Sequence, residues 1–294
     1  MTLLVCLRET GRVLLLADTR ISGDVGIKTD SGPKLLSVPI KVSQGSSNPL
    51  PSVSGVYGFA YAGSTLSAMS AYALAVTCLQ SLVTPEAPRL PSTEAVADLI
   101  ARIGTRYIRE VGAPFECFVV GPADDGAAPE AYCVRTVMRD GLATLGTAPL
   151  DKTRRGFWAL GSGAEPFMTF AKAGAPWPSV TASVIAFIDA EIDSRVGGHL
   201  QAGVCNTEGF SPYLIMKPQS DGDGGEIDGS FLGVSEHDIG LIDGMEVGAD
   251  VFGPPSVFRE GVSASHAIAG SQGVYRGYWR SPDANPRTQD DEPS

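Results

Sequence analysis

The sequence predicts an α+β protein built as a four-layer αββα sandwich, in which paired helices cover the outer faces of two antiparallel sheets. Strand-length apolar runs follow one another across short polar turns, a spacing typical of antiparallel hairpins. Segments of helical length come in pairs between groups of such strands, so each pair can cover one sheet. No glycine fingerprint links a strand to a following helix, which disfavours a dinucleotide-binding fold.

The first elements are four strands, expected over residues 2–10, 12–20, 34–42 and 56–64. The first two form a hairpin that turns around Gly11. A glycine-rich loop over residues 21–34 leads to the third strand, where Pro39 indicates an edge position or a bulge. A polar loop over residues 43–55, rich in serine and proline, precedes the fourth strand.

Two helices follow, expected over residues 65–83 and 91–112. The first lacks glycine and proline and is rich in alanine and leucine, so it is expected to be largely buried. In the second, Ser92 or Thr93 can cap the N-terminus, Glu94 lies in the first turn and Gly112 ends the helix. Further strands are expected over residues 115–124, 130–138 and 156–163, two helices over 164–174 and 179–198, and final strands over 202–209 and 211–218.

Composition divides the chain into a folded domain over residues 1–218, an acidic glycine-rich extension over 219–280 and a disordered tail over 281–294. Most of the net charge of −11 lies at the C-terminal side, where fourteen acidic residues from Ser220 onward face four arginines and no lysine. The first 219 residues carry nineteen acidic and eighteen basic residues. Neither part offers a basic patch, so nucleic-acid binding is disfavoured and the extension is expected to be a solvated acidic segment.

Several other classes of protein are disfavoured by simple patterns. The chain has no stretch of eighteen apolar residues, which argues against a membrane span. The apolar stretch near the start is broken by Arg8 and Glu9 and follows no basic region, so a signal peptide is not expected and a cytoplasmic location is. Five cysteines without a C-x-x-C pair predict reduced thiols in the core. Three histidines without a zinc-binding pattern predict neither a metal nor a cofactor.

Three residues near the start could carry chemistry. Thr2, Asp18 and Lys34 are spaced sixteen residues apart, with Asp18 at the end of the second expected strand and Lys34 at the start of the third. If those strands are neighbours, the end of one lies near the start of the other. A small polar cluster at the rim of a sheet is therefore expected.

The motifs around these residues resemble a known family. The opening "MT" with its strand, "ADTR" after the second strand, "GPKLL" entering the third, "YAGS" before the first helix and "LGSG" before the third look like the proteasome β-type subunits and the bacterial HslV-type protease. These are N-terminal nucleophile (Ntn) hydrolases with an αββα fold. The resemblance covers about the first 217 residues in element order and is compatible with a divergent bacterial proteasome homologue.

The resemblance implies that Thr2 becomes the N-terminal nucleophile once Met1 is removed. An α-amine has a pKa of about 7.7–8.0, so the amine of Thr2 can take the proton from its own hydroxyl. Lys34 would supply positive charge beside the nucleophile, and Asp18 would pair with Lys34 and orient it.

Further residues take family roles by position. Gly63 is expected to provide a backbone N–H for the oxyanion. Ser162 and Asp193 match positions that hydrogen-bond around the amine of the nucleophile. Additional substrate-binding candidates are Arg20, which is expected to brace the loop carrying Lys34, and Ile21, Gly32, Leu36 and Tyr61, which are expected to line an apolar or small acyl-side pocket.

The sequence also departs from the family pattern. Val196 stands where the family has a serine after the aspartate, the loop over residues 43–55 is long, and the acidic extension has no counterpart in the short bacterial protease.

Three functions therefore stay open. The favoured one is a threonine peptidase in homo-oligomeric rings that cleaves polypeptides, with an ATP-dependent unfoldase as the partner implied by the resemblance. The others are an Ntn amidase or acylase acting on a small-molecule amide and a non-catalytic scaffold subunit of a proteasome-like ring.

Overall fold

A computed structural model of the chain describes most of the first 218 residues and short parts of the remainder. The described residues are 2–23, 26–45, 53–123, 127–151, 156–173, 179–218, 227–239, 250–252 and 274–275. All statements of structure below concern these ranges.

The first sheet has nine strands among the described residues and carries the N-terminus of the described chain. Its main path runs β11-β1-β2-β12-β13-β14-β15, and β16 pairs with β13 and β17. The bounds are β1 Leu4–Glu9, β2 Arg12–Asp18, β11 Gly156–Leu160, β12 Leu200–Asn206, β13 Gly209–Pro218, β14 Ile227–Phe231, β15 Val234–Ser235, β16 Asp250–Phe252 and β17 Val274–Tyr275. Strand β1 pairs antiparallel with β2 and β11, so the predicted first hairpin is confirmed.

The second sheet has six described strands in the order β10-β9-β8-β6-β5-β7. The bounds are β5 Leu35–Gln44, β6 Val53–Gly63, β7 Leu82–Thr84, β8 Phe115–Gly121, β9 Glu130–Arg139 and β10 Leu142–Pro149. Strand β7 pairs only with residues 42–44 of β5, so β5 is an edge strand at Pro39, as that proline predicts. A separate two-stranded hairpin is formed by β3 (Ile21–Gly23) and β4 (Gly26–Thr29).

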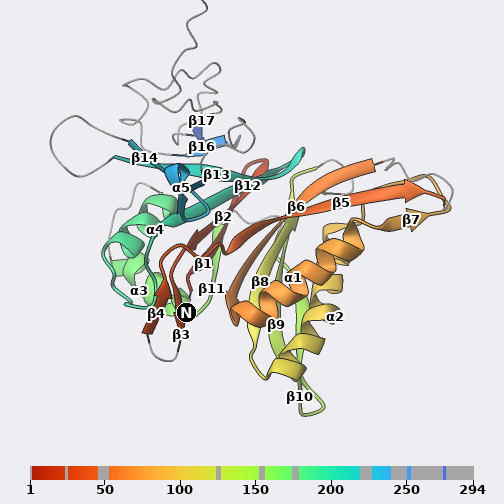
Figure 1. Ribbon diagram of the computed structural model, residues 1–294, viewed down its shortest axis with the longest axis horizontal. Helices are drawn as coiled ribbons and strands as arrows, with labels where there is room; N and C mark the ends of the chain where they lie inside the picture. Colours follow the sequence, from red (N-terminus) through yellow and green to blue (C-terminus); the bar gives the residue numbers. More distant parts are fainter. Residues whose placement is uncertain are drawn as a thin grey trace, which may run out of the picture.

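Two pairs of helices enclose the sheets (Figure 1). Helices α1 (Thr65–Leu79) and α2 (Thr93–Val111) pack on the six-stranded sheet, and α3 (Ala164–Ala173) and α4 (Val180–Asp189) pack on the nine-stranded sheet. A one-turn helix, α5 (Glu236–Ile239), follows β15. The predicted four-layer αββα sandwich is confirmed.

Burial on both faces explains the continuous apolar runs at the start of the chain. Alternate side chains of a strand point to opposite faces of the sheet. Leu4 and Cys6 of β1 lie in the core between the sheets, whereas Leu3 and Val5 pack in the core shared with α3 and α4. A strand buried on both sides needs no polar positions, so "LLVCL" shows no alternation.

Several predicted elements differ from the structure. The helix expected over residues 179–198 ends at Asp189, because the chain leaves the helical path at Glu191, whose φ is 45°. Strand β10 and the β3–β4 hairpin were not predicted, since their segments are short or rich in glycine and threonine. Four cysteines are buried as expected, whereas Cys78 is exposed on α1.

Part of the predicted acidic extension continues the first sheet. Strand β14 pairs antiparallel with β13 over five residue pairs, from Leu214–Phe231 to Pro218–Ile227. The predicted disordered tail over residues 281–294 lies outside the described residues. None of the described helices is both long and apolar enough to cross a membrane.

Candidate active site

A buried ion pair lies where β2 ends and the chain enters β5. Lys34 Nζ donates to Asp18 Oδ1 at 2.8 Å and to the carbonyl of Arg20 at 2.6 Å. The Lys34 side chain is 1% exposed and the Asp18 side chain is fully buried. The expected cluster therefore contains Asp18 and Lys34 in direct contact.

Asp18 also connects this pair to the nucleophile candidate. The backbone N–H of Leu3, the residue after Thr2, donates to Asp18 Oδ1 at 2.9 Å. The N–H groups of Arg20 and Gly197 donate to Oδ2 at 3.2 and 3.3 Å. The Asp18 carboxylate therefore holds four groups in place: the backbone directly after Thr2, the Lys34 ammonium, and the backbone N–H groups of Arg20 and Gly197.

The electrostatics of the pair follow from burial. Desolvation raises the pKa of the Asp18 carboxyl, and the Lys34 charge with the surrounding N–H donors opposes that shift. Desolvation likewise lowers the pKa of the Lys34 ammonium, and Asp18 opposes it. Since four donors converge on the carboxylate, each charged group is stabilised mainly by the other and by backbone dipoles.

A buried glutamine holds the loop that presents Lys34. Gln201 of β12 accepts hydrogen bonds from the N–H groups of Lys34 and Leu35 at 2.9 and 3.1 Å through Oε1. Its Nε2 donates to the Gly32 carbonyl at 2.7 Å. These three bonds join the first sheet to the start of β5 and give both polar atoms of the Gln201 side chain a partner.

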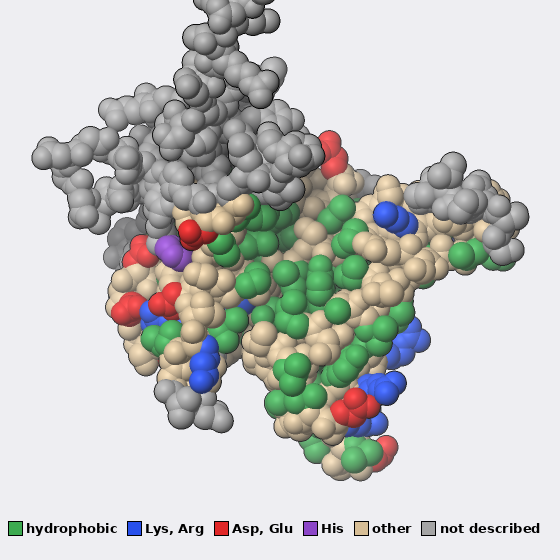
Figure 2. Space-filling model, viewed as in Figure 1, with side chains coloured by type: hydrophobic (Ala, Val, Ile, Leu, Met, Phe, Trp, Pro, Cys, Tyr) green, Lys and Arg blue, Asp and Glu red, His purple; other side chains and the backbone are tan. Residues whose placement is uncertain are grey.

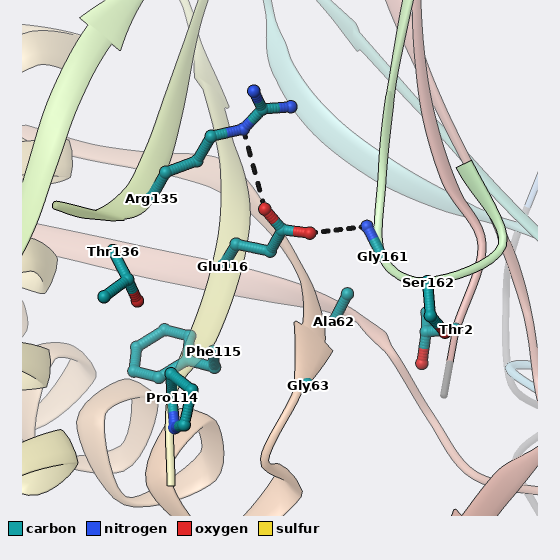
Figure 3. A pocket seen from close by; sticks show the side chains of 10 residues that line it. All are labelled: Thr2, Ala62, Gly63, Pro114, Phe115, Glu116, Arg135, Thr136, Gly161 and Ser162. Carbon is teal, nitrogen blue, oxygen red and sulfur yellow. Dashed lines mark hydrogen bonds and ion pairs between the residues drawn. The ribbon is translucent and has the colours of Figure 1, made fainter. Parts of the chain in front are cut away.

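Thr2 lies at the wall of a cavity of about 570 Å³ between the two sheets (Figure 3). The lining residues are Thr2, Ala62, Gly63, Pro114, Phe115, Glu116, Arg135, Thr136, Gly161 and Ser162. Thr2 is 4% exposed. Three predicted site residues, Thr2, Gly63 and Ser162, therefore share one cavity of a size suited to a small organic group or a peptide segment.

The turn before α3 contacts the backbone of Thr2. Gly163 N–H donates to the Thr2 carbonyl at 3.1 Å. A Cβ on Gly161, whose φ is +87°, would lie 2.0 Å from the same oxygen. Only glycine permits this approach at this backbone angle, which gives a physical reason for the "LGSG" motif.

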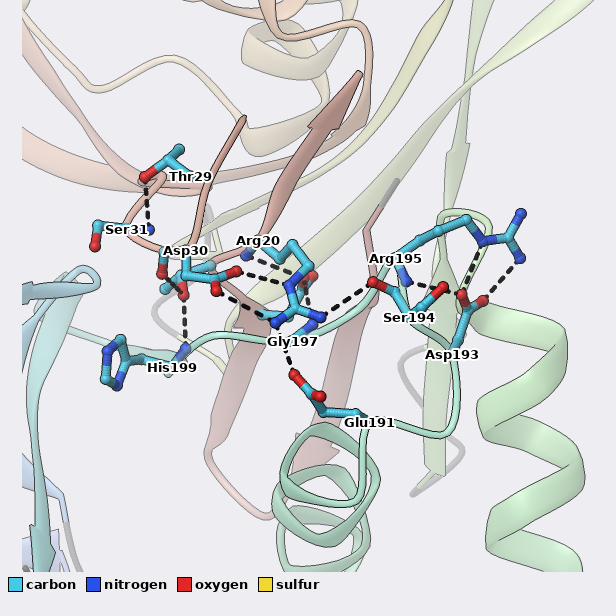
Figure 4. A network of polar contacts seen from close by, with 12 residues as sticks. Arg20, Thr29, Asp30, Ser31, Glu191, Asp193, Ser194, Arg195, Gly197 and His199 are labelled. Carbon is cyan, nitrogen blue, oxygen red and sulfur yellow. Dashed lines mark hydrogen bonds and ion pairs between the residues drawn. The ribbon is translucent and has the colours of Figure 1, made fainter. Parts of the chain in front are cut away.

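Arg20 and Asp193 lie in a polar network beside the ion pair (Figure 4). The Arg20 side chain donates to both carboxylate oxygens of Asp30, to Glu191 Oε1 at 2.7 Å and to the Ser194 carbonyl at 3.0 Å. Arg20 therefore ties the loop that leads to Lys34 to the loop after α4. The guanidinium group of Arg20 is the donor in all of these hydrogen bonds.

Asp193 is held by a neighbour in the sequence. Arg195 contacts it through the backbone N–H at 3.0 Å and through two side-chain nitrogens at 2.8 Å each. These bonds lower the pKa of Asp193, the side-chain contact with Arg195 contributing most. The Asp193 carboxylate is thus stabilised in its charged form by Arg195.

Val196 occupies an apolar site next to the turn that contacts Thr2. The residue is fully buried in the same core cluster as Leu3, and a Cβ on Gly163 would lie 2.6 Å from its Cγ2. The position where the sequence resemblance implies a serine hydroxyl is therefore filled by hydrocarbon.

The remaining predicted substrate-binding residues lie outside the lining of the cavity. Ile21 packs over Gly32, where its Cδ1 would lie 2.2 Å from an added Cβ. Tyr61 is buried with its hydroxyl donating to the Pro33 carbonyl at 3.2 Å, and Leu36 packs against the core under α1 and α2. These four residues surround the segment that carries Lys34, so an acyl-side pocket there stays a prediction.

The likeness to known proteins is structural. No model of a known protein family and no curated protein matches the sequence. The helical assembly of the Anbu complex from Pseudomonas aeruginosa aligns with a TM-score of 0.50 and 15% identity, over 72% of this chain and 85% of that chain. The chain shares its fold with Anbu. The Gly-1 mutant of Anbu from Hyphomicrobium sp. strain MC1 aligns with a TM-score of 0.49 and 14% identity, over 70% and 82% of the two chains.

Two residues of this site were not identified from the sequence. Gln201 follows a loop in "HLQAGV", and Glu116 interrupts the apolar strand "FECFVVG". A single polar residue in an otherwise buried strand is the signal that could have indicated each of them. Their partners, however, lie far away in the chain, at 167 residues for the Gln201–Lys34 bond and 45 residues for the Glu116–Gly161 bond, so only the fold reveals what they bind.

Proposed function

We propose that the chain is a threonine-type peptidase that uses Thr2 as its nucleophile after removal of Met1. The observation that carries the proposal is the bridge through Asp18, which accepts hydrogen bonds from both Lys34 Nζ and the N–H following Thr2. A buried lysine–carboxylate pair is costly unless it is well bonded, and here it lies directly behind a threonine that opens onto a cavity.

The proposed reaction begins with the free amine of Thr2. The amine takes the proton of the Thr2 hydroxyl, and the oxygen forms a bond to the carbonyl carbon of the substrate amide. The oxyanion of the tetrahedral intermediate is stabilised by the N–H of Gly63, and Lys34 provides positive charge nearby. The protonated amine then gives its proton to the leaving nitrogen as the C–N bond breaks. Water hydrolyses the resulting ester and regenerates Thr2.

Assembly into a closed or helical oligomer is part of the proposal. The solved structure of the Anbu complex from Pseudomonas aeruginosa is described as a helical assembly. Apolar side chains are exposed over α1, where Leu66 and Leu74 are 63% and 40% exposed (Figure 2). The β9–β10 hairpin exposes Met138 and Leu142. Exposed apolar side chains of this kind favour contacts between copies.

An oligomer would enclose the proposed cleavage sites, and an ATP-dependent unfoldase would then be needed to deliver folded substrates. This part of the proposal rests on the family analogy alone. Peptides and unfolded chains are therefore the first substrates to test.

The test measures the intact mass of protein purified from its native host before and after treatment with a peptide epoxyketone, which reacts with both the amine and the hydroxyl of an N-terminal threonine. The expected result is loss of the Met1 mass and a single covalent adduct that Thr2→Ala abolishes. Thr77→Ala is a matched control, because its exposed hydroxyl bonds the Ala73 carbonyl within α1. Retained methionine with no adduct would contradict the proposal.

A non-catalytic scaffold subunit is the second candidate, and a specific observation favours it. Val196 places hydrocarbon where the family has a hydroxyl, and Arg195 binds the Asp193 carboxylate that the amine would otherwise contact. The scaffold would form the same oligomer, which size-exclusion chromatography would detect, but it would give no adduct.

A further inference from the structure

We propose that Glu116 is a positioning residue that sets the distance between the nucleophile and the oxyanion donor. The inference rests on the proposed function, since it assigns a role in the reaction of Thr2. Glu116 Oε1 accepts a hydrogen bond from Gly161 N–H at 2.6 Å, and both residues line the cavity with Thr2 (Figure 3). A carboxylate that accepts an N–H at this distance forms a strong, charge-assisted bond.

The bond spans the two sheets at the reaction centre. Glu116 belongs to β8 of the six-stranded sheet, and Gly161 directly follows β11 of the nine-stranded sheet. Thr2 precedes β1 of the nine-stranded sheet, whereas Gly63 ends β6 of the other sheet. The two groups that must act on the same carbonyl therefore come from different layers.

Each end of the bond is attached to one of these groups. On one side, Gly161 packs on the Thr2 carbonyl so closely that an added Cβ would lie 2.0 Å from it, and Gly163 donates to that carbonyl. On the other side, Glu116 is the register partner of Ala62, next to Gly63 in β6. The Glu116–Gly161 bond thus links the turn that holds Thr2 to the strand end that presents Gly63.

Arg135 supports the orientation of Glu116. Its Nε lies 3.5 Å from Glu116 Oε2, and its Nη2 donates to the Ala159 carbonyl of β11 at 3.4 Å. Arg135 is about half exposed, so this ion pair is weak in energy. Its contribution is geometric, because it leaves Oε1 directed at Gly161.

The size of the expected effect follows from the geometry of catalysis. A misplacement of about 1 Å between reacting groups can lower a rate about 100-fold. Removing the acceptor should therefore lower kcat, while KM for a peptide substrate should change little, because Glu116 is proposed to act through Gly161 and not on the substrate.

The experiment compares Glu116→Ala, Glu116→Gln and the control Glu9→Ala by the rate of epoxyketone labelling and by kcat and KM on a fluorogenic peptide. Glu116→Ala should lose about 10- to 100-fold in labelling rate and kcat. Glu116→Gln keeps an oxygen acceptor and should recover to within about 3-fold of the unmodified protein. Glu9 pairs with Arg12 in the β1–β2 hairpin, seven residues from Thr2 and roughly 23 Å away along an extended strand, so its removal should change neither rate.

Hydrogen exchange separates this inference from the proposed function. The backbone amide hydrogen of Gly161, followed in the segment of residues 160–163, should exchange faster in Glu116→Ala than in the unmodified protein. In Glu116→Gln its exchange rate should be close to that of the unmodified protein. Equal exchange in all three proteins would overturn the inference, and so would equal labelling rates or a glutamine variant as slow as the alanine variant. If the unmodified protein is not labelled, the proposed peptidase is wrong, and exchange alone still decides whether Glu116 holds the turn. If Glu116→Ala fails to fold, Glu116→Gln and Arg135→Ala are compared by the same two measurements.

Discussion

Replacing Lys34 by methionine tests the ion pair on which the candidate site depends. The substitution keeps a long unbranched side chain but removes the ammonium group, which bonds Asp18 Oδ1 at 2.8 Å and the Arg20 carbonyl at 2.6 Å. Asp18 is 0% exposed, so its carboxylate cannot be hydrated in place of the lost partner.

Removing one partner of a buried ion pair costs about 3–5 kcal/mol of unfolding free energy. Three N–H donors, from Leu3, Arg20 and Gly197, remain on the Asp18 carboxylate and stabilise part of its charge. The expected loss for Lys34→Met is therefore at the lower end, about 3 kcal/mol. Asp18→Asn should cost a similar amount, because its amide NH₂ would face N–H groups that need an acceptor.

The assay is urea unfolding of the two single variants and the double variant at one fixed protomer concentration, because an oligomer unfolds in a concentration-dependent way. The double variant should be less destabilised than the sum of the single variants by about 1–3 kcal/mol, as expected for groups in direct contact. Strictly additive losses would refute the argument that Asp18 and Lys34 stabilise each other.

Three further predictions follow from other contacts at the site. Gly161→Ala should abolish epoxyketone labelling, because its Cβ would clash with the Thr2 carbonyl, and the φ of +87° should by itself lower the free energy of unfolding by about 1–3 kcal/mol. The control Gly156→Ala, where a Cβ meets no atom within 4 Å, should be labelled normally. Normal labelling of both variants would contradict the close-packing argument. Val196→Ser should increase the labelling rate, because it places a hydroxyl at this position. The free energy of unfolding should fall by about 1–3 kcal/mol, because the hydroxyl would be fully buried. An unchanged labelling rate would show that the missing hydroxyl does not limit the chemistry. Arg20 lowers the pKa of Asp30, so the stabilisation from Asp30 is fully present above the unfolded-state pKa of about 3.9 and is lost as the pH falls through the lower folded-state value. Asp30→Asn should therefore narrow the difference in unfolding free energy between pH 5 and pH 3, and an unaltered pH dependence in urea titrations would count against this ion pair.

The elements with strong periodicity or clear end signals were predicted well from the sequence. Helix α2 begins after Ser92, whose side chain accepts from the Ala95 N–H, and ends at Gly112 in the left-handed conformation, as the capping residues indicate. The first hairpin turns at Gly11, whose φ of 73° is accessible to glycine at little cost. Local chemistry fixes such elements, so local sequence is enough to find them.

The end of α4 shows where local signals fail. The Gly197-Gly198 pair indicates a helix stop, but the helix ends eight residues earlier, at Asp189. Residues 190–198 instead follow contacts with distant parts of the chain: Arg20 binds Glu191 and the Ser194 carbonyl, and Asp18 accepts from Gly197. These tertiary bonds outweigh the helical preference of a short polar segment.

The sequence by itself determined the layer order, the first hairpin and the spacing of Thr2, Asp18 and Lys34, because these depend on apolar periodicity, turn residues and strand order. Only the tertiary structure decided what those residues contact. Asp18 bridges Lys34 and the N–H after Thr2, and Glu116 joins β8 to the turn at Gly161 across the two sheets. A hydrogen bond between residues 45 positions apart depends on how two sheets pack face to face, and neither strand carries that information in its own sequence.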